Sequence, residues 1–339
     1  MYVPEALGRA SDLLHGPHLM SQLIRFVAAR FLLAIVTLLI VTFITFSLME
    51  LNPVDAFARC TAERLDFIPR HENYVVRWLN WVLDIFLHGD LGFTCLSRMQ
   101  INTLLGDKFW ISLGICISSL LLAYLIAIPV GIYSAVSPNF TLNHILRFFS
   151  YLGLAIPNFM FALILILMWS SFFGETLTGL FSREYQAADW SVARFVDFLA
   201  HAWLPILVLG WSATAFALLS IRALVSDEYG KQYVTAARAR GVSGGQLLWR
   251  YPARHALGPI VNSLGFDLNR VFNELPIVAF ILAITDAGAL LLNATVQSND
   301  TQLAAAIIFL LTASVITLNF LTDIMLAVLD PQFRRSLLG

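Results

Sequence analysis

Residues 110–135 read WISLGICISSLLLAYLIAIPVGIYSA, an apolar run without Asp, Glu, Lys or Arg. A helix needs about 20 mostly apolar residues to cross a bilayer core that is about 30 Å thick. Further windows meet the same requirement, and the full set is 26–49, 110–135, 148–173, 203–225, 259–284 and 303–329. The sequence therefore predicts an all-α integral membrane protein with six transmembrane helices.

The composition of the whole chain agrees with a membrane protein. Of 339 residues, 58% are hydrophobic and 13% are charged, and the mean hydropathy is +0.76. A soluble domain carries about a quarter charged residues. The formal net charge of -1 provides no basic face for nucleic acid, so that class of partner is excluded. The stretch Phe31 to Met49 is too long for a signal-peptide core, and we expect it to remain as a membrane anchor.

The distribution of Lys and Arg predicts the orientation, because these residues gather in short cytoplasmic loops. They are frequent in the loops on the side of both termini and absent from 285–302 on the other side, so both termini should be cytoplasmic. The predicted regions are an N-terminal cytoplasmic segment 1–21, a first transmembrane helix 22–49, an extracytoplasmic region 50–109, a five-helix core 110–329 with a cytoplasmic loop 226–258, and a cytoplasmic tail 330–339. Met20 is an alternative start.

Two local features of the extracytoplasmic region stand out. Apolar and polar side chains alternate at helical spacing between residues 77 and 88, which predicts an amphipathic helix that either lies along the membrane surface or packs against the bundle. Cys60 and Cys95 share the region, and two free thiols are a simpler interpretation than a disulfide. With no C-x-x-C pair and only scattered histidines, the sequence indicates no metal site.

The cytoplasmic loop carries the clearest pattern, SDEYGKQYVTAARARGVSGGQLLWRYPARHALGP, at residues 226–259. Helical spacing up to Gly241 predicts a helix that ends at a left-handed glycine. Ser243 and Gln246 fit an S-x-x-Q capping box that opens a second helix. Two short helices with small residues and arginines would form a compact knob suited to a groove on a partner, or simply a basic surface loop.

Several stretches resemble the dipeptide/oligopeptide permease family of ABC importers. The main one is the run from Tyr233 to Gly241, followed by Leu247, Leu248, Arg250, Ala256, Leu257 and Pro259, which is similar to that family's EAA loop. Others are Arg25 to Pro53, Gly89-Asp90-Leu91-Gly92, Ala155 to Phe159, Leu204-Pro205 and Leu329 to Arg334, in the family's order. The resemblance covers roughly residues 21–335.

The resemblance implies a type I ABC importer permease fold in a bacterial inner membrane. It implies a second permease subunit, two ATPase subunits that carry ATP and Mg, and an extracytoplasmic solute-binding protein as partners. The loop would dock on an ATPase through Tyr233, Ala236, Ala237, Arg238, Arg240, Gly241, Gln246 and Leu247. The chain has no Walker A motif, since Val225 stands where the glycine before Gly230-Lys231 would be. It is therefore expected to be a non-catalytic pore subunit without a cofactor of its own.

The sequence departs from the family pattern at two places. Pro252 follows Tyr251, so the second short helix is expected to end early. The family's Pro-Gly-Leu-Gly signature is replaced by Asp286-Ala287-Gly288-Ala289, which leaves the outer gate undefined.

Asp267, Arg270 and Glu274 lie at i, i+3 and i+7 in window 259–284, on one helix face, with Asn273 beside them. Charges near the bilayer centre cost about 2.5 to 3.5 kcal/mol each on insertion scales, so they should face protein or water. They either line a pathway for a charged or zwitterionic solute, or form a self-neutralising cluster at a subunit interface.

The predicted function is a permease subunit for peptides or similar small solutes. The alternatives are nickel, oligosaccharide or polyamine as the solute, or an autonomous channel or secondary carrier. Secondary carriers often contain inverted repeats, and we find none here. A membrane enzyme is disfavoured, because no nucleophile–base pair or ligand set recurs on one helix.

Overall fold

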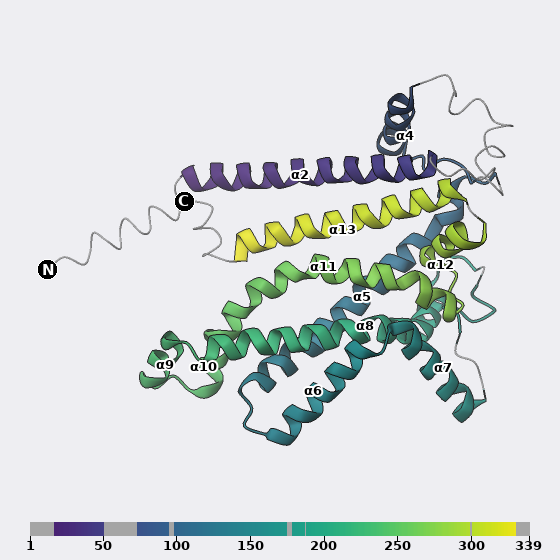
Figure 1. Ribbon diagram of the computed structural model, residues 1–339. Coiled ribbons are helices and arrows are strands. Elements are labelled where there is room, and N and C mark those ends of the chain that lie inside the picture. The colour runs from purple at the N-terminus through teal and green to yellow at the C-terminus, as the bar shows by residue number, and fades with distance from the viewer. Residues whose placement is uncertain are drawn as a thin grey trace.

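The computed structural model describes residues 17–50, 73–94, 98–174, 178–186, 188–298 and 300–329. The regular elements of this part of the chain, labelled in Figure 1, are α2 (Pro17–Glu50), α4 (Tyr74–His88), α5 (Ile101–Val136), α6 (Phe140–Ala155), α7 (Asn158–Phe173), α8 (Val192–Tyr229), α9 (Gln232–Ala239), α10 (Gly244–Arg250), α11 (Pro252–Ile281), α12 (Ala287–Leu292), η1 (Asn293–Gln297) and α13 (Thr301–Leu329). Cys60, Cys95 and the expected tail 330–339 lie outside the described residues. Cys116 is a buried free thiol.

Four helices of the described residues are long and apolar enough to cross a membrane: Ile24–Ser47 within α2, α5, α8, and Gln302–Met325 within α13. The window expected to span the membrane at 148–173 is not one straight helix, because α6 and α7 meet there with a bend of 105°. Ile156 at the break is extended, with φ -91° and ψ 115°, as the residue before a proline tends to be. Only if this pair is counted as one span does the number reach five, so six spans stay a prediction.

α5 and α8 form the centre of the bundle and run in the same direction. A methyl group added to Gly131 of α5 would lie 2.9 Å from Ile221 of α8. One added to Gly210 would lie 3.1 Å from the Ser119 carbonyl oxygen. The two contacts have nearly the same sequence offset, which establishes the parallel register. Small residues at these positions let the two backbones approach closely.

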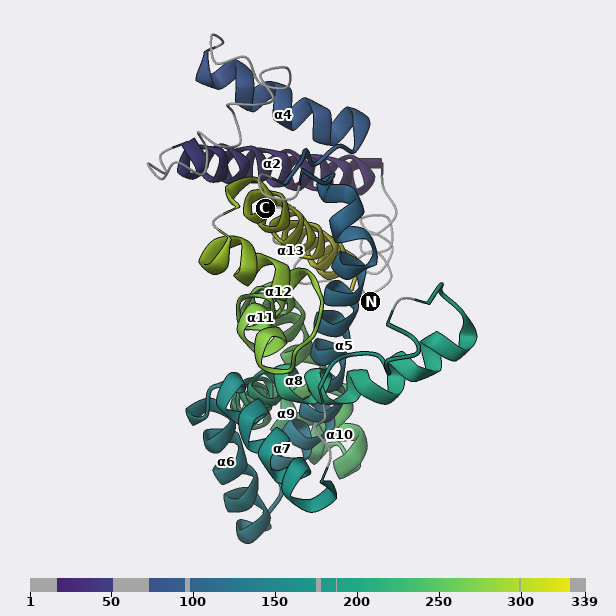
Figure 2. The same ribbon diagram turned by 90° about the vertical axis from the view of Figure 1, so that its right-hand side faces the viewer.

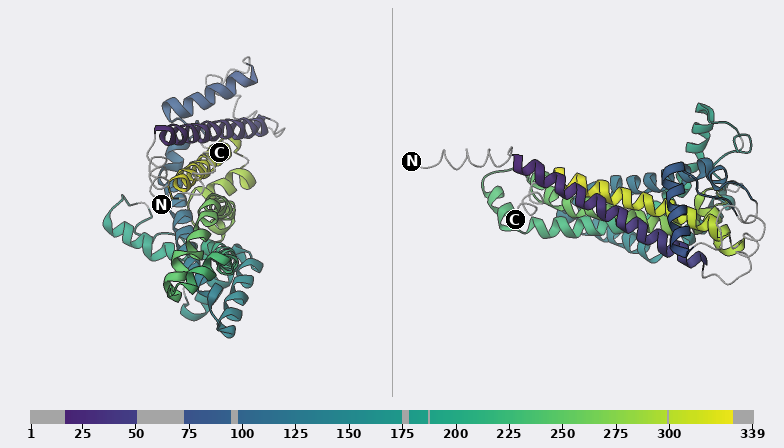
Figure 3. Two further views of the ribbon diagram at one scale, coloured as in Figure 1. Left: turned by 90° about the vertical axis from the view of Figure 1, so that its left-hand side faces the viewer. Right: turned by 90° about the horizontal axis from the view of Figure 1, so that it is seen from above.

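The bundle has two distinct ends. α9 and α10 lie at one end, together with the start of α2 and the end of α13, and α4, α7 and α12 lie at the other (Figure 1, and the right panel of Figure 3). α8 runs toward the α9 end and α11 runs back from it. The loop expected at 226–258 therefore starts inside α8, and only α9, α10 and their turns project beyond the long helices.

α2, α4 and α13 form a layer on one side of the core (Figure 2). Arg30 of α2 pairs with Asp323 of α13 at 3.3 Å. The expected amphipathic helix is confirmed as α4. Its Trp81 ring contacts Phe46 of α2 and Phe309 of α13, and Val82 is buried. These contacts favour packing against the bundle over the membrane-surface alternative.

Candidate functional site

The knob, defined here as residues 232–250 of α9 and α10, has a small core of its own. Val234, Ala237 and Leu247 are fully buried in it. Four half-buried residues complete that core, and these are Tyr229, Tyr233, Val242 and Tyr251. The knob is thus a folded unit rather than an extended loop.

The turn at Gly241 joins the two short helices. Its φ is +84°, which glycine adopts without steric cost. The Gly241 N–H donates to the Arg238 carbonyl at 3.0 Å, and the Val242 N–H donates to the Ala237 carbonyl at 3.3 Å. This is the Schellman pattern of a helix C-terminus, and the expected glycine stop is confirmed.

The second short helix begins where expected but without the expected capping box. Ser243 is the N-cap residue of α10, yet its side chain makes no capping hydrogen bond. Ser243 and Gln246 are both exposed, so water competes for the same backbone groups. The helix ends at Arg250 and α11 starts at Pro252, as the proline predicts.

Exposure divides the predicted docking residues into two groups. Ala236, Arg238, Arg240, Gly241 and Gln246 are exposed and available to a partner, whereas Tyr233 is half-buried and Ala237 and Leu247 are buried. The buried pair can act only through the shape of the knob. Trp249, which sequence reasoning did not select, is 57% exposed. A large aromatic side chain in a loop expected to lie outside the membrane was the available signal.

The knob is tied to the end of α8 by polar contacts. The Tyr233 hydroxyl donates to Glu228 Oε2 at 2.6 Å, and the Lys231 ammonium bonds to the other carboxylate oxygen. Burial raises the pKa of the Tyr233 hydroxyl, and the Glu228 carboxylate adds to that rise, so the phenol keeps its proton. The Tyr233 ring also lies 5.3 Å from His255 of α11. Both long helices next to the knob are therefore held to it.

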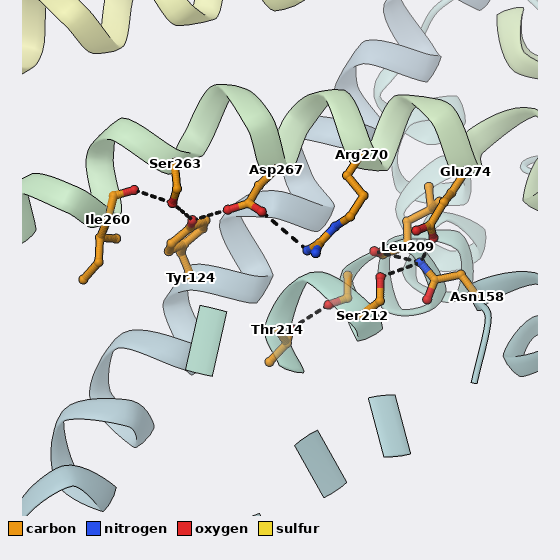
Figure 4. Close-up of polar contacts among 11 residues, drawn as sticks. Tyr124, Asn158, Leu209, Ser212, Thr214, Ile260, Ser263, Asp267, Arg270 and Glu274 are labelled. Atoms are coloured by element: carbon orange, nitrogen blue, oxygen red, sulfur yellow. Dashed lines mark hydrogen bonds and ion pairs between the residues drawn. The ribbon is translucent and has the colours of Figure 1, made fainter. Parts of the chain in front are cut away.

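The charges of α11 lie along one side of the helix and bond to other helices (Figure 4). The Tyr124 hydroxyl of α5 donates to Asp267 Oδ2 at 2.5 Å and lies 2.9 Å from the Ser263 hydroxyl. Asp267 is 4% exposed, and its Oδ1 lies 3.5 Å from Arg270 Nη2. Asp267 thus ties α11 to α5 as well as pairing with Arg270.

Glu274 is bonded separately. It accepts a hydrogen bond from the Asn158 amide at the start of α7, and the same amide lies 3.1 Å from the Ser212 hydroxyl of α8. Arg270 stacks over the Phe216 ring at 4.8 Å, and its Nε is buried without a hydrogen-bond partner. A single cluster of Arg270 with both acids does not form.

The asparagines of α11 point elsewhere. Asn262, Asn269 and Asn273 are all exposed and, at spacings of seven and four, lie along one face that also carries the exposed Phe266. Sequence reasoning found the charges of α11 but not their partners Tyr124, Asn158, Ser212 and Phe216. A tyrosine inside an apolar run and an asparagine directly after Pro157 were the signals present.

At the opposite end from the knob, Asp286 caps α12. Its carboxylate accepts from the Ala289 N–H and from the Ser112 hydroxyl of α5, both at 2.8 Å. Asp286 is fully buried, and burial raises the pKa of its carboxyl to about 6. The residue that replaces the family signature therefore fixes α12 to α5. Among the described residues, no group of three or more His, Cys, Asp or Glu could hold a metal.

Known proteins resemble most of the chain. At 27% identity, the oligopeptide transport system permease protein AppB of Bacillus subtilis matches 91% of this chain and 98% of its own length. The inner membrane ABC transporter permease protein YejB of Escherichia coli O157:H7 is 30% identical, over 78% of this chain and 72% of its own. The dipeptide transport system permease protein DppB of Escherichia coli K12 is 24% identical, over 93% and 100%.

A solved structure and a family model complete the comparison. The inward-facing MetNI methionine ABC transporter contains a chain that superposes with a TM-score of 0.50 at 18% identity, covering 69% of this chain and 96% of that one. That likeness supports the expected permease fold. The family model described as "Binding-protein-dependent transport system inner membrane component" matches residues 127–335, which include the knob and the polar face of α11. The chain belongs to this family of multi-pass inner-membrane transport components.

Proposed function

We propose that the chain is a pore subunit of an ATP-driven importer for peptides or similar small solutes. The complex would contain a second, similar permease, two ATPase subunits that bind and hydrolyse ATP with Mg, and an extracytoplasmic solute-binding protein. The chain would cross the membrane six times, with both termini in the cytoplasm. Peptide as the solute class is supported by the names of the relatives AppB and DppB.

The observation that carries this proposal is the knob's position between α8 and α11. These two helices also hold the buried polar contacts, because Glu274 of α11 and Ser212 of α8 share the Asn158 amide. A partner that moves the knob would therefore move the helices that carry these contacts. A ligand shifts such an equilibrium only through different affinities for the two states, and ATP binding to the partner would supply that difference.

The docking surface would consist of the exposed part of the knob. Arg238 and Arg240 offer positive charge to an acidic groove rim, and Ala236 allows close approach. Trp249 adds an aromatic side chain of the kind that is enriched among energetically important interface residues. Ala237 and Leu247 would hold these groups in place from inside the knob.

The pathway would involve Arg270 and Asn273 of α11. Asp267 and Glu274 are engaged by α5 and α7, whereas Arg270 keeps an unpaired Nε and Asn273 is exposed. Polar side chains at membrane depth face protein or water rather than lipid. The side with Asn273, Asn269 and Asn262 would therefore face the solute or the second permease.

The first test is affinity purification of the tagged chain in mild detergent with mass spectrometry of co-eluting proteins. Recovery of an ATPase that falls at least tenfold in the double variant Arg238→Glu and Arg240→Glu supports the proposal. Arg183→Glu, an exposed arginine at the opposite end, is the matched control and should recover the ATPase normally. A chain that purifies alone under every condition would instead favour an autonomous carrier.

The second test separates pathway from interface. Arg270→Ala and Asn273→Ala should each reduce uptake in vesicles while the subunits still co-purify. Unchanged uptake together with weakened assembly would assign these residues to a subunit interface instead.

A further inference from the structure

A cavity of about 560 Å³ lies at the end of the bundle opposite the knob. It is lined by the start of α5, by residues 179–181 and Gln186 before α8, by Arg194 within α8, and by Ala283 and Thr285 after α11. Figure 2 looks onto this end of the molecule. The volume falls within the range of about 300–1,000 Å³ that is typical of small-molecule sites.

Arg194 belongs to the cavity wall and is only 9% exposed. Its guanidinium packs against two neighbouring aromatic rings, 4.5 Å from the Trp190 centroid and 4.8 Å from the Phe181 centroid, and the two rings meet edge to face at 6.1 Å. Nη1 donates to the Ala188 carbonyl at 2.5 Å. Nε is buried and has no hydrogen-bond partner. The guanidinium is thus held by two rings and by one hydrogen bond, and its Nε donor has no partner.

The charges around the cavity leave Arg194 without a counterion in the described part of the chain. The Asp107 carboxylate accepts a hydrogen bond from the Trp190 indole and forms no ion pair with Arg194. The second cation of the wall, Lys108, donates to the Leu104 carbonyl at 2.7 Å and likewise has no acidic partner among the described residues. Two cations and one carboxylate line the cavity, which therefore favours an anion.

Backbone conformation also distinguishes this wall. Gly106 has φ +39° inside α5, where the helix is interrupted, and Gly179 has φ +83°. Ala283 has φ +52°, which is uncommon for a residue with a Cβ. For a residue with a side chain, such as Ala283, this conformation costs about 1–3 kcal/mol and is typical of ligand sites, whereas glycine adopts it without steric cost. Here all three border the same cavity.

We propose that this cavity binds a small carboxylate, held by the guanidinium of Arg194. A guanidinium offers paired N–H donors in one plane that match the two oxygens of a carboxylate. Lys108 adds positive charge from the α5 side. If the chain is an importer pore subunit, as proposed above, the cavity lies at the end where solute enters and captures the carboxylate of the solute before it reaches α11.

Binding can be measured on the full chain, with its co-purifying partners, in lipid nanodiscs by ligand-observed NMR. The probe is N-acetyl-L-alanine, and the neutral N-acetyl-L-alaninamide is the matched ligand control at constant ionic strength. We expect saturable binding of the acid, at least tenfold weaker binding of the amide, and at least tenfold weaker binding of the acid to Arg194→Gln. Arg183→Gln, which removes an exposed arginine outside the cavity, should bind the acid normally.

Equal binding of acid and amide would overturn the proposal, and so would normal binding by a folded Arg194→Gln. If that variant does not fold, Arg194→Lys decides, since it keeps the charge and loses the paired donors. A tenfold loss in Arg194→Lys supports the inference, and unchanged affinity contradicts it. The assay does not depend on an ATPase, so its failure is separate from a failure of the co-purification test.

Discussion

The turn at Gly241 allows the link between the knob's fold and its docking to be tested quantitatively. A side chain at this position would meet no atom within 4 Å, so substitution introduces backbone strain and no clash. With φ at +84°, an L-residue costs roughly 1–2 kcal/mol. Asn tolerates this region better than Ala, and β-branched Val tolerates it least. The strain should therefore increase in the order Gly, Asn, Ala, Val.

This strain is large relative to the knob. The core of the knob has only Val234, Ala237 and Leu247 fully buried, and units with few buried contacts open locally at low free energy. Each 1.4 kcal/mol corresponds to a tenfold change in an equilibrium constant. Gly241→Val should therefore raise local opening of residues 232–250 by about tenfold or more.

Two measurements on one set of variants test the argument. Hydrogen exchange of residues 232–250 reports local opening, and the amount of ATPase recovered per permease reports docking. Both should follow the strain order. Gly244→Ala is the control, because Gly244 is also exposed, has open space around it and lies at a helical position in the same knob. Equal ATPase recovery in the Asn and Val variants would refute the reasoning, as would a loss of recovery without faster exchange.

Three further predictions concern packing and titration. Leu247→Ala should destabilise the knob by about 2–5 kcal/mol. Hydrogen exchange should then be faster in α9 and α10 and unchanged in α5. Exchange in α9 that stays slow would contradict a core shared by the two short helices. The pKa of Asp286 is about 6 in the folded protein and near 3.9 when unfolded, so the folded state holds this proton more tightly and stability falls as pH rises from about 4 to about 6. Asp286→Asn should reduce this loss of stability by up to about 3 kcal/mol, measured by thermal unfolding at a series of pH values. If the variant keeps the pH profile of the unaltered protein, Asp286 is not its source. A methyl group on Gly265 would lie 1.4 Å from the Asn319 amide oxygen, so Gly265→Ala should lower the thermal unfolding temperature. Adding Asn319→Ala to this variant should restore that temperature. If the effects of the two substitutions simply add, the contact is contradicted.

Local sequence signals predicted the knob well and the long-range contacts poorly. The glycine stop at Gly241 and the helix start after Ser243 depend on backbone preferences of a few neighbouring residues, and both are present. The expected side-chain cap of Ser243 is absent, because a cap on an exposed helix start competes with water. The acid Asp267 was found from its spacing, but its partner Tyr124 is 143 positions away, and no pattern within one helix contains that information.

The prolines illustrate the same limit. Pro129, Pro205 and Pro276 lie inside helices that continue past them, whereas the chain breaks at Pro157. The difference lies in the residue directly after the break. Asn158 starts α7 and its amide reaches α8 and α11, so the bend is compensated by contacts that only the tertiary structure supplies. Single-sequence reasoning weighs the four prolines alike.

These contacts also constrain how the bundle can change shape. α11 begins at the knob, is bonded to α5 through Asp267 and to α7 through Glu274, and ends beside the carboxylate cavity. Removing one partner of a buried ionic contact costs about 3–5 kcal/mol, so a second conformation must supply new partners for both acids. Arg270 lies between Asp267 and Glu274 on the same face and has an unpaired Nε. We therefore expect Arg270 to be the side chain that changes partners when α11 moves, and Arg270→Ala to impair the transition in addition to destabilising the folded state.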